Sequence, residues 1–181
     1  MESLFTDKTI YNVRKPDCSD KENVCYDTLE ELGISYERVG HEHIGTIEGC
    51  EEIRQVLGVK ICKNLFLCNA QKTDFYLVMM PGEKPFKTKF LSPQLGCSRL
   101  SFAPTEFMVE YLNCTPGSAS VLGLLFDKNI KVRLVIDKDL LEDEYLGCHP
   151  CDNSSSLKIK TTDIIEKLLP HTYHTPTFVE L

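Results

Sequence analysis

The 181 residues of this chain, 42% hydrophobic and 26% charged, are enough to form one globular domain with a substantial core. The formal net charge of −7 argues against a protein that coats DNA or RNA with basic residues, but it permits a local basic patch. No apolar run approaches the ~18–20 residues of a membrane-spanning helix, and no signal peptide is evident. Nine cysteines without a secretion signal favour reduced thiols, so we expect a cytoplasmic protein.

Apolar periodicity and capping residues predict the elements of the first half of the chain. A polar arm over residues 1–17 leads into the domain, which we expect to span 18–172. The predicted elements are a helix over 20–32, a strand over 34–39, a short helix introduced by Thr46 and Glu48, and a hairpin of strands 63–69 and 74–80.

The second half of the chain continues the mixture of helices and strands. The predicted elements are a helical turn over 92–96, a helix over 104–112, strands over 130–137 and 157–160, and a helix over 161–169 that Pro170 ends. Residues 173–181 are expected to form a polar tail. Strands mixed with helices, and no internal linker, predict a single α+β domain with a mixed sheet.

The stretch Lys63-Asn64-Leu65-Phe66-Leu67 has the period-two pattern of a strand. Leu65 and Leu67 point to one face, and Asn64 and Phe66 point to the other. A lysine at the start of a buried strand is either a solvated charge or a cation held over a pocket, and spacing alone favours the solvated charge.

Lysines and aromatic residues alternate after the hairpin. Lys84, Lys87 and Lys89 surround Phe86 and Phe90. Such a segment can hold a nucleic acid through phosphate contacts and base stacking. It can equally be an edge strand whose lysines prevent aggregation, and the pattern leaves both interpretations open.

Two further segments have chemical potential. Small residues around Gly117, from Thr115 to Val121, let a backbone approach a ligand and direct N–H groups at an oxygen. The pair Cys148 and Cys151 could be a redox dithiol, but it precedes a polar run instead of opening a helix. A zinc site would need two further ligands, and no second C-x-x-C motif exists.

Four segments in this order resemble a known family. They are Lys63-Asn64-Leu65-Phe66-Leu67, Arg99-Leu100-Ser101-Phe102-Ala103, Thr115-Pro116-Gly117-Ser118-Ala119-Ser120, and His149-Pro150 with Asn153. Together they resemble the YbaK/ProX (PrdX) superfamily of aminoacyl-tRNA deacylases, also called the prolyl-tRNA synthetase associated editing domain. The resemblance extends over about residues 20–170 and implies a mostly antiparallel, partly barrel-like sheet flanked by helices.

The resemblance also implies an activity. Members of this family hydrolyse the ester of mischarged tRNA, most often alanine on tRNA(Pro), with no metal or other cofactor. A hydroxyl of the substrate is thought to help activate the attacking water. The implied partners are the acceptor end of mischarged tRNA and, as a possible partner, prolyl-tRNA synthetase; no DNA and no membrane are expected.

The family motifs assign roles to residues of this chain. Lys63 is implied as the catalytic cation. The implied substrate-binding residues are Asn64, Gly117, Ser118, Ala119, Ser120, Val121, His149 and Asn153. The implied weak tRNA contacts are Lys84, Lys87 and Lys89. Fixed N–H donors and a cation suit this reaction, because ester hydrolysis builds negative charge on the carbonyl oxygen.

One position departs from the family pattern. The family loop usually ends in proline, whereas this chain has Val121, which restores an N–H and does not fix φ. Two alternatives to an alanine-specific deacylase therefore stay open: hydrolysis of another mischarged tRNA such as Cys-tRNA(Pro), and a regulator that binds an aminoacyl-tRNA or amino acid without turnover. A thiol redox protein using Cys148 and Cys151 is a third.

Overall fold

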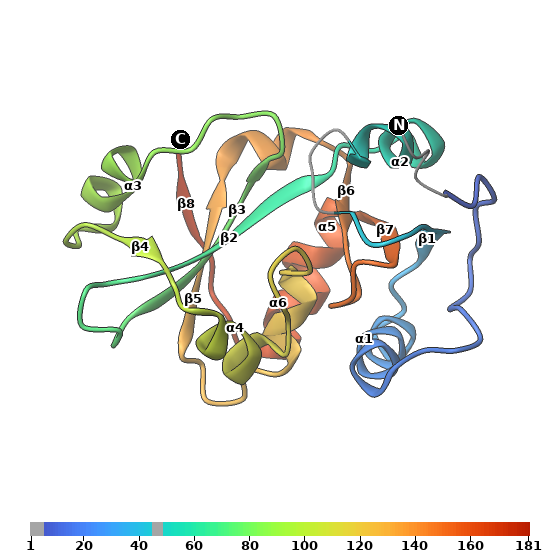
Figure 1. Cartoon of the computed structure of the whole chain (residues 1–181), viewed down its shortest axis with the longest axis horizontal. Helices are drawn as coiled ribbons and strands as arrows, with labels where there is room; N and C mark the ends of the chain where they lie inside the picture. Colours follow the sequence, from blue (N-terminus) through green and yellow to red (C-terminus); the bar gives the residue numbers. More distant parts are fainter. Residues whose placement is uncertain (1–5, 45–48) are drawn as a thin grey trace.

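The computed structural model describes residues 6–44 and 49–181, and its strands form two sheets (Figure 1). The strands are β1 Tyr36–Gly40, β2 Cys62–Cys68, β3 Phe75–Pro81, β4 Ser101–Phe102, β5 Val132–Asp137, β6 Tyr145–Cys148, β7 Ser155–Lys160 and β8 Thr177–Val179. The order is β1-β7-β6 in the first sheet and β4-β2-β3-β5-β8 in the second.

Helices cover these sheets on several sides (Figure 1). The α-helices are α1 Asp20–Glu31, α2 Gly49–Leu57, α3 Thr88–Leu95, α4 Thr105–Leu112, α5 Thr161–Asp163 and α6 Leu169–Thr172. The other helical segments are the 3₁₀ helices η1 Val121–Leu125 and η2 Lys138–Glu142 and the π-helical η3 Ile164–Leu168. Among the described helices, none has the length and apolar character needed to span a bilayer.

The pairing of the strands confirms the predicted α+β class with a mixed, mostly antiparallel sheet. β2 forms the predicted hairpin with β3, while β3–β5 and β5–β8 are parallel pairs. The expectation of a partly barrel-like sheet is wrong. Within the described residues the two sheets meet through a bridge between Ile61 and Gly147, and neither sheet closes on itself.

The main core lies against one face of the five-stranded sheet. Phe66 of β2 and Leu134 of β5 pack there with Leu29 of α1 and Ile159 of β7. Leu67 packs in a second cluster, on the opposite face of β2 with Leu91 of α3. The alternation predicted for β2 is therefore confirmed, and Lys63 lies on the α3 face because it has the parity of Leu67.

The beginning of the domain follows local sequence signals. Ser19 and Glu22 form a capping box at the start of α1, as their spacing of three predicts. Two short bridges, from Thr6 to His41 and from Tyr11 to Arg38, hold the N-terminal arm beside β1. The expected helix start at Thr46 and Glu48 lies outside the described residues.

Two predictions about the chain after residue 80 are wrong. The first is the edge strand that was one of two open interpretations of residues 83–90, because α3 already begins at Thr88. The C-terminal helical segment also continues through Pro170 to Thr172. It widens into a π turn in which the Leu169 N–H bonds to the Ile164 carbonyl, so the donor that Pro170 lacks is accommodated.

Three strands have weak sequence signals and were not predicted, and the first of them, β4, has only two residues. β6 has only four residues and contains Gly147, and β8 lies in the segment expected to be a tail. β8 pairs in parallel with β5, with Val135 opposite Thr177. The pairing with β5, and not the local sequence, makes this segment a strand.

The two sheets meet where the backbone around Ile61 passes between two glycines. The Gly147 N–H bonds to the Lys60 carbonyl at 3.1 Å. A Cβ atom on Gly147 would lie 2.5 Å from Ile61 Cδ1 and 3.1 Å from the Lys60 oxygen, and one on Gly82 would lie 2.7 Å from the Ile61 oxygen. We call this contact the Ile61 clasp. Gly82 is required there because a Cβ would overlap the Ile61 carbonyl, whereas a Cβ on Gly147 would displace the end of the Ile61 side chain and crowd the Lys60 oxygen.

We expect Gly82→Ala to lower the free energy of unfolding by about 1–3 kcal/mol, because the added methyl group would lie 2.7 Å from the Ile61 carbonyl oxygen and overpack the clasp. Chemical denaturation measures this change. Gly40→Ala is the matched control, since its Cβ would lie in ordinary contact, 3.6 Å from an Arg38 nitrogen. Equal stability of the two variants would contradict the account of the clasp.

Candidate active site

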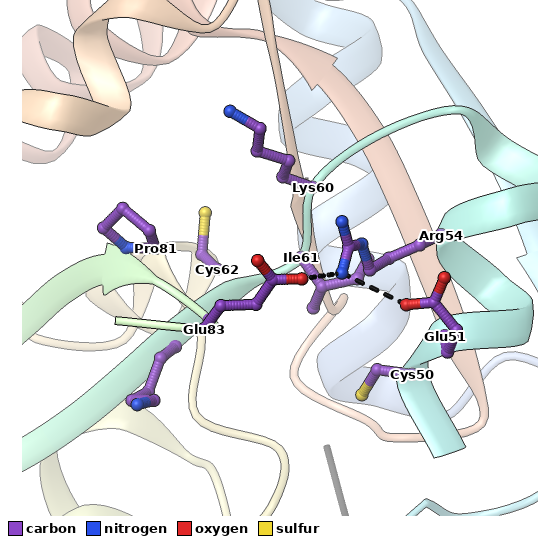
Figure 2. A pocket seen from close by; sticks show the side chains of 10 residues that line it. Cys50, Glu51, Arg54, Lys60, Ile61, Cys62, Pro81 and Glu83 are labelled. Carbon is purple, nitrogen blue, oxygen red and sulfur yellow. Dashed lines mark hydrogen bonds and ion pairs between the residues drawn. The ribbon is translucent and has the colours of Figure 1, made fainter. Parts of the chain in front are cut away.

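A pocket of about 540 Å³ lies beside the clasp, between α2, the start of β2 and the turn after β3 (Figure 2). Its walls are formed by Cys50, Glu51 and Arg54 of α2, by residues 60–63 and by residues 81–83. We call it the Lys63 pocket. The clasp places the first residues of β2 at this pocket, so Lys63 lines it although the strand continues into the core.

The ammonium group of Lys63 is held by a backbone carbonyl. Its Nζ donates a hydrogen bond to the Lys84 oxygen at 2.8 Å. Lys84 is itself fixed, because its own Nζ pairs with Asp137 at 2.8 Å and Asp139 at 2.7 Å. No carboxylate of the described residues forms an ion pair with Lys63, so its charge is not neutralised and two N–H donors remain for another acceptor.

Ion pairs close one wall of the Lys63 pocket. Arg54 donates to Glu51 of its own helix at 3.1 Å and also pairs with Glu83, as Figure 2 shows. This second pair connects α2 to the turn after β3. Lys60 also lines the pocket, but its ammonium pairs with Asp143 at 2.8 Å.

A second pocket, of about 310 Å³, is formed at the predicted glycine loop. It is lined by His43, Ile44, residues 115–118, Asp152 and Asn153 and is called the glycine-loop pocket. Pro116 and Gly117 occupy the centre of a β-turn in which the Ser118 N–H bonds to the Thr115 oxygen at 2.9 Å. The φ of 89° at Gly117 is the value that the third position of a type II turn requires.

The loop offers N–H groups but no free hydroxyl. The Ser118 hydroxyl donates to the Thr115 carbonyl at 2.9 Å, and the Ser120 oxygen accepts from the Leu122 N–H at 3.2 Å. The backbone N–H groups of Gly117 and Ala119 have no acceptor among the described residues. The side chains therefore hold the loop in shape while two amides are available to an anionic oxygen.

Val121 begins η1 and is fully buried in the main core. Ser120, which precedes it, has φ −151° and ψ 152°, the extended conformation that a residue before proline adopts. The first position of a helix also tolerates proline, because its N–H has no helical partner. The loop with Val121 therefore has a backbone that a family proline would fit.

We expect Val121→Pro to change the free energy of unfolding by less than about 1.5 kcal/mol, because backbone restriction offsets the lost packing. Leu122→Pro, one residue later, is the control, since it removes the N–H that bonds to Ser120. Thermal unfolding should show a near-unchanged first variant and a strongly destabilised second one. A large loss with Val121→Pro would show that valine has changed the loop.

Asn153 lies at the glycine loop and His149 lines neither pocket, and both are engaged with the backbone. His149 Nδ1 lies 2.8 Å from the Ser155 carbonyl oxygen, so this nitrogen carries the proton. Burial lowers the pKa of His149, which keeps the ring neutral. Asn153 donates its amide N–H to the Ile44 carbonyl while it lines the glycine-loop pocket.

The cysteines near the site are buried thiols. Burial raises the pKa of Cys148. The Cys151 sulfur lies 3.7 Å from that of Cys25. This arrangement does not resemble a redox dithiol, which needs an accessible thiolate. Over residues 6–44 and 49–181 no three His, Cys, Asp or Glu side chains converge in a way that could hold a metal ion.

The predicted site residues are thus distributed over two neighbouring pockets. Gly117, Ser118 and Asn153 share one, and Lys63 lines the other. The two are connected through one apolar cluster, to which Ile44 of the glycine-loop pocket and Cys50 and Ile61 of the Lys63 pocket belong. They are also connected along the chain. Ile44 lines the glycine-loop pocket, and Cys50, six positions later in the sequence, lines the Lys63 pocket.

The other predicted residues lie outside the pocket linings. Ala119, Ser120 and Val121 are buried and line neither pocket. Asn64 lies on the opposite face of β2 from Lys63, and its Oδ1 is buried without a hydrogen-bond partner in the described part of the chain. Lys84 is engaged in ion pairs, so its predicted tRNA contact stays a prediction.

Sequence reasoning missed the acidic and basic side chains around Lys63. Glu51 and Arg54 are three residues apart on α2, a spacing that signals a helical ion pair. Nothing local indicates that the same arginine reaches Glu83. The walls of the glycine-loop pocket at His43 and Asp152 depend in the same way on contacts between distant segments.

An unpaired lysine beside one pocket and unpaired amide N–H groups in the next are the features of a hydrolase that stabilises an oxyanion. The comparison with known families agrees: residues 41–167 match the model described as the aminoacyl-tRNA editing domain. The chain belongs to this family, which confirms the expected superfamily and the enzyme class, an aminoacyl-tRNA deacylase.

Individual relatives support the same assignment. The prolyl-tRNA editing protein ProX of Acetoanaerobium sticklandii is 34% identical over 153 residues, 84% of this chain and 93% of the relative. The prolyl-tRNA synthetase associated domain-containing protein 1 of Danio rerio is 29% identical, over 83% and 82%. A solved structure described as a candidate trans-editing enzyme for prolyl-tRNA synthetase has a TM-score of 0.65 at 16% identity, over 91% and 99%, which confirms the fold.

The buried His41 predicts how stability depends on pH. Its Nδ1 lies 2.8 Å from the Glu42 carbonyl oxygen and its Nε2 lies 2.9 Å from the Ser156 hydroxyl, and burial lowers its pKa to about 4. The unfolded chain therefore takes up a proton near pH 6.5, before the folded one does. We expect the free energy of unfolding to fall by up to about 3 kcal/mol as the pH is lowered from 6.5 to 4.

Chemical denaturation across this pH range measures the loss, and His41→Gln should flatten the profile. His43→Gln, at an exposed position, should leave the profile unchanged. A wild-type stability that does not change between pH 6.5 and 4 would contradict the neutral buried state of His41.

Proposed function

We propose that this chain acts in trans on mischarged tRNA(Pro) in the cytoplasm and hydrolyses the ester that joins the wrong amino acid, most often alanine, to the tRNA. Membership in the editing-domain family supports the reaction class. The name of the ProX relative supports a prolyl-tRNA system, and prolyl-tRNA synthetase is then the natural source of the substrate.

The observation that carries the proposal is the state of Lys63. Its ammonium is held at the edge of a pocket by the Lys84 carbonyl, with no carboxylate of the described residues to neutralise it. A lysine that merely solubilised a strand end would have no reason to be fixed in this way. A positioned, uncompensated cation is suited to a reaction in which negative charge develops.

The proposed mechanism is direct attack by water. The aminoacylated 3′ end lies across the two pockets, with the ester between the Lys63 ammonium and the N–H group of Gly117, which lines the glycine-loop pocket. Water attacks the carbonyl carbon, and these donors stabilise the oxyanion that forms; the ester C–O bond then breaks, and the ribose oxygen leaves as a hydroxyl with the proton that the water gives up. The terminal hydroxyl of the substrate assists the water, as the family resemblance implies.

The described residues favour water over an enzyme nucleophile. Ser118 and Ser120 are occupied within the loop, and burial keeps the Cys148 thiol protonated. Among the described serine side chains, that of Ser156 is the one whose hydroxyl is hydrogen-bonded to a histidine, His41, and Ser156 is 1% exposed. No acyl-enzyme intermediate is therefore expected.

The choice of amino acid follows from the logic of editing. A synthetase site for proline cannot strongly exclude the smaller alanine by binding alone, so a second site must remove it. Both pockets are larger than an alanyl, seryl or cysteinyl group, and their size does not select among these. Alanine is therefore the first substrate to test and cysteine the second. The regulator alternative loses its support, because the loop with Val121 has a proline-compatible backbone.

We expect Lys63→Ala to lower kcat for hydrolysis of Ala-tRNA(Pro) by about 10²–10³-fold, as the loss of an oxyanion donor does in other hydrolases. Release of labelled alanine under single-turnover conditions measures this rate. Lys60→Ala is the matched control, because it lines the same pocket while its ammonium pairs with Asp143. A wild-type rate in the Lys63 variant, or an equal loss in both, would contradict the role of Lys63.

A further inference from the structure

A third surface hollow, of about 800 Å³, lies between the first turn of α3 and the edge strand β4. It is formed by Lys87 and Lys89 at the start of α3, Ser92 within it, and Arg99 and Phe102 before and in β4. We call it the Lys87 groove. Lys87 and Lys89 lie on the segment with alternating basic and aromatic residues. Arg99 and Phe102 lie later in the chain, and the fold brings them beside this segment.

The charge of the Lys87 groove is opposite to that of the whole chain. Lys87, Lys89 and Arg99 are exposed and none forms an ion pair with a described residue, and no acidic residue lines the groove. The chain as a whole carries a net charge of −7. Three uncompensated cations on an acidic protein mark a place that attracts an anion.

The start of α3 adds to this attraction. The helix has eight residues, its cap residue Lys87 makes no side-chain capping bond, and no acidic residue lies in its first turn. The first N–H groups of a helix have no internal partner and carry partial positive charge, which suits a phosphate.

Ser92 is an independent sign of a ligand. It lines the groove and is 8% exposed, and its hydroxyl is buried without a hydrogen-bond partner among the described residues. A buried hydroxyl left unpaired costs stability, so such a group usually has a partner that the protein alone does not supply.

Phe102 gives the groove an aromatic surface. Its side chain is 67% exposed at the edge of the five-stranded sheet, opposite Leu67 of β2. Cross-strand partners point to one face, so Phe102 lies on the face of Lys63 and Leu67. Leu67 follows Lys63 by four positions on β2, about 13 Å of extended strand.

We propose that the Lys87 groove binds single-stranded RNA, which in the proposed function is the unpaired 3′ end of the substrate tRNA. The cations and the start of α3 bind phosphates, Ser92 donates to one of them, and a base stacks on Phe102. This inference deepens the proposed function and rests on it for the identity of the RNA. It favours a single strand over a duplex, because a duplex hides the base faces that an exposed ring can stack on.

Fluorescence anisotropy with a labelled, unstructured RNA of about six nucleotides tests the groove without any ester chemistry. We expect Phe102→Ala to weaken binding about tenfold, whereas Tyr173→Ala, at a ring 80% exposed elsewhere, leaves it unchanged. The slope of log K against log salt concentration should become shallower by about 1.4 in the double variant Lys87→Glu/Arg99→Glu, because two phosphate contacts are lost.

Lys128→Glu/Lys131→Glu is the charge-matched control, at two exposed lysines of another loop. Ser92→Ala should weaken binding about fivefold while stability is unchanged or higher, because the unpaired hydroxyl is removed. That combination separates a ligand contact from a structural role.

If the single strand binds and the groove variants weaken its binding as stated, RNA binding at the Lys87 groove is supported, even if deacylation fails and the proposed function is abandoned. Preference for duplex RNA, binding of inorganic phosphate alone, or equal losses in the control variants would overturn it. If the groove variants keep full RNA affinity while Lys63→Ala abolishes deacylation, the assignment of the Lys87 groove as an RNA site is wrong and the proposed function stands.

Discussion

The site depends on the close approach of backbones at Ile61. Gly82 and Gly147 let the segment before β2 pass between the turn after β3 and strand β6, at distances that a Cβ atom would not permit. This contact brings the two sheets together and fixes the direction in which β2 leaves the Lys63 pocket. The position of the Lys63 ammonium follows, because the Lys84 carbonyl that holds it lies on the segment just beyond Gly82.

The chemistry of the site follows from what is paired and what is left unpaired. Lys84, Lys60 and Arg54 all have carboxylate partners, whereas Lys63 has none in the described part of the chain. The glycine loop shows the same division. Its serine hydroxyls are hydrogen-bonded, whereas the N–H groups of Gly117 and Ala119 have no acceptor among the described residues. Such a site offers positive charge and N–H donors but no activated nucleophile, which suits hydrolysis by water.

Local patterns predicted much of the fold and part of the site. The β2–β3 hairpin and the capped helix α1 are encoded by alternation and by Ser19 with Glu22, and both are present. β8 and the continuation through Pro170 were missed, because a parallel partner and a π turn override the local signal. The family motifs indicated Lys63 and Gly117, yet only the fold shows that they line two pockets instead of one.

The most direct test of the account is the rate at which the wild-type protein releases amino acids from a panel of charged tRNAs. Alanyl-, cysteinyl- and seryl-tRNA(Pro) are compared with prolyl-tRNA(Pro) at equal enzyme concentration. The account predicts that alanyl-tRNA(Pro) is cleaved well above its spontaneous rate while prolyl-tRNA(Pro) is left intact. Spontaneous rates for every member of the panel would contradict it.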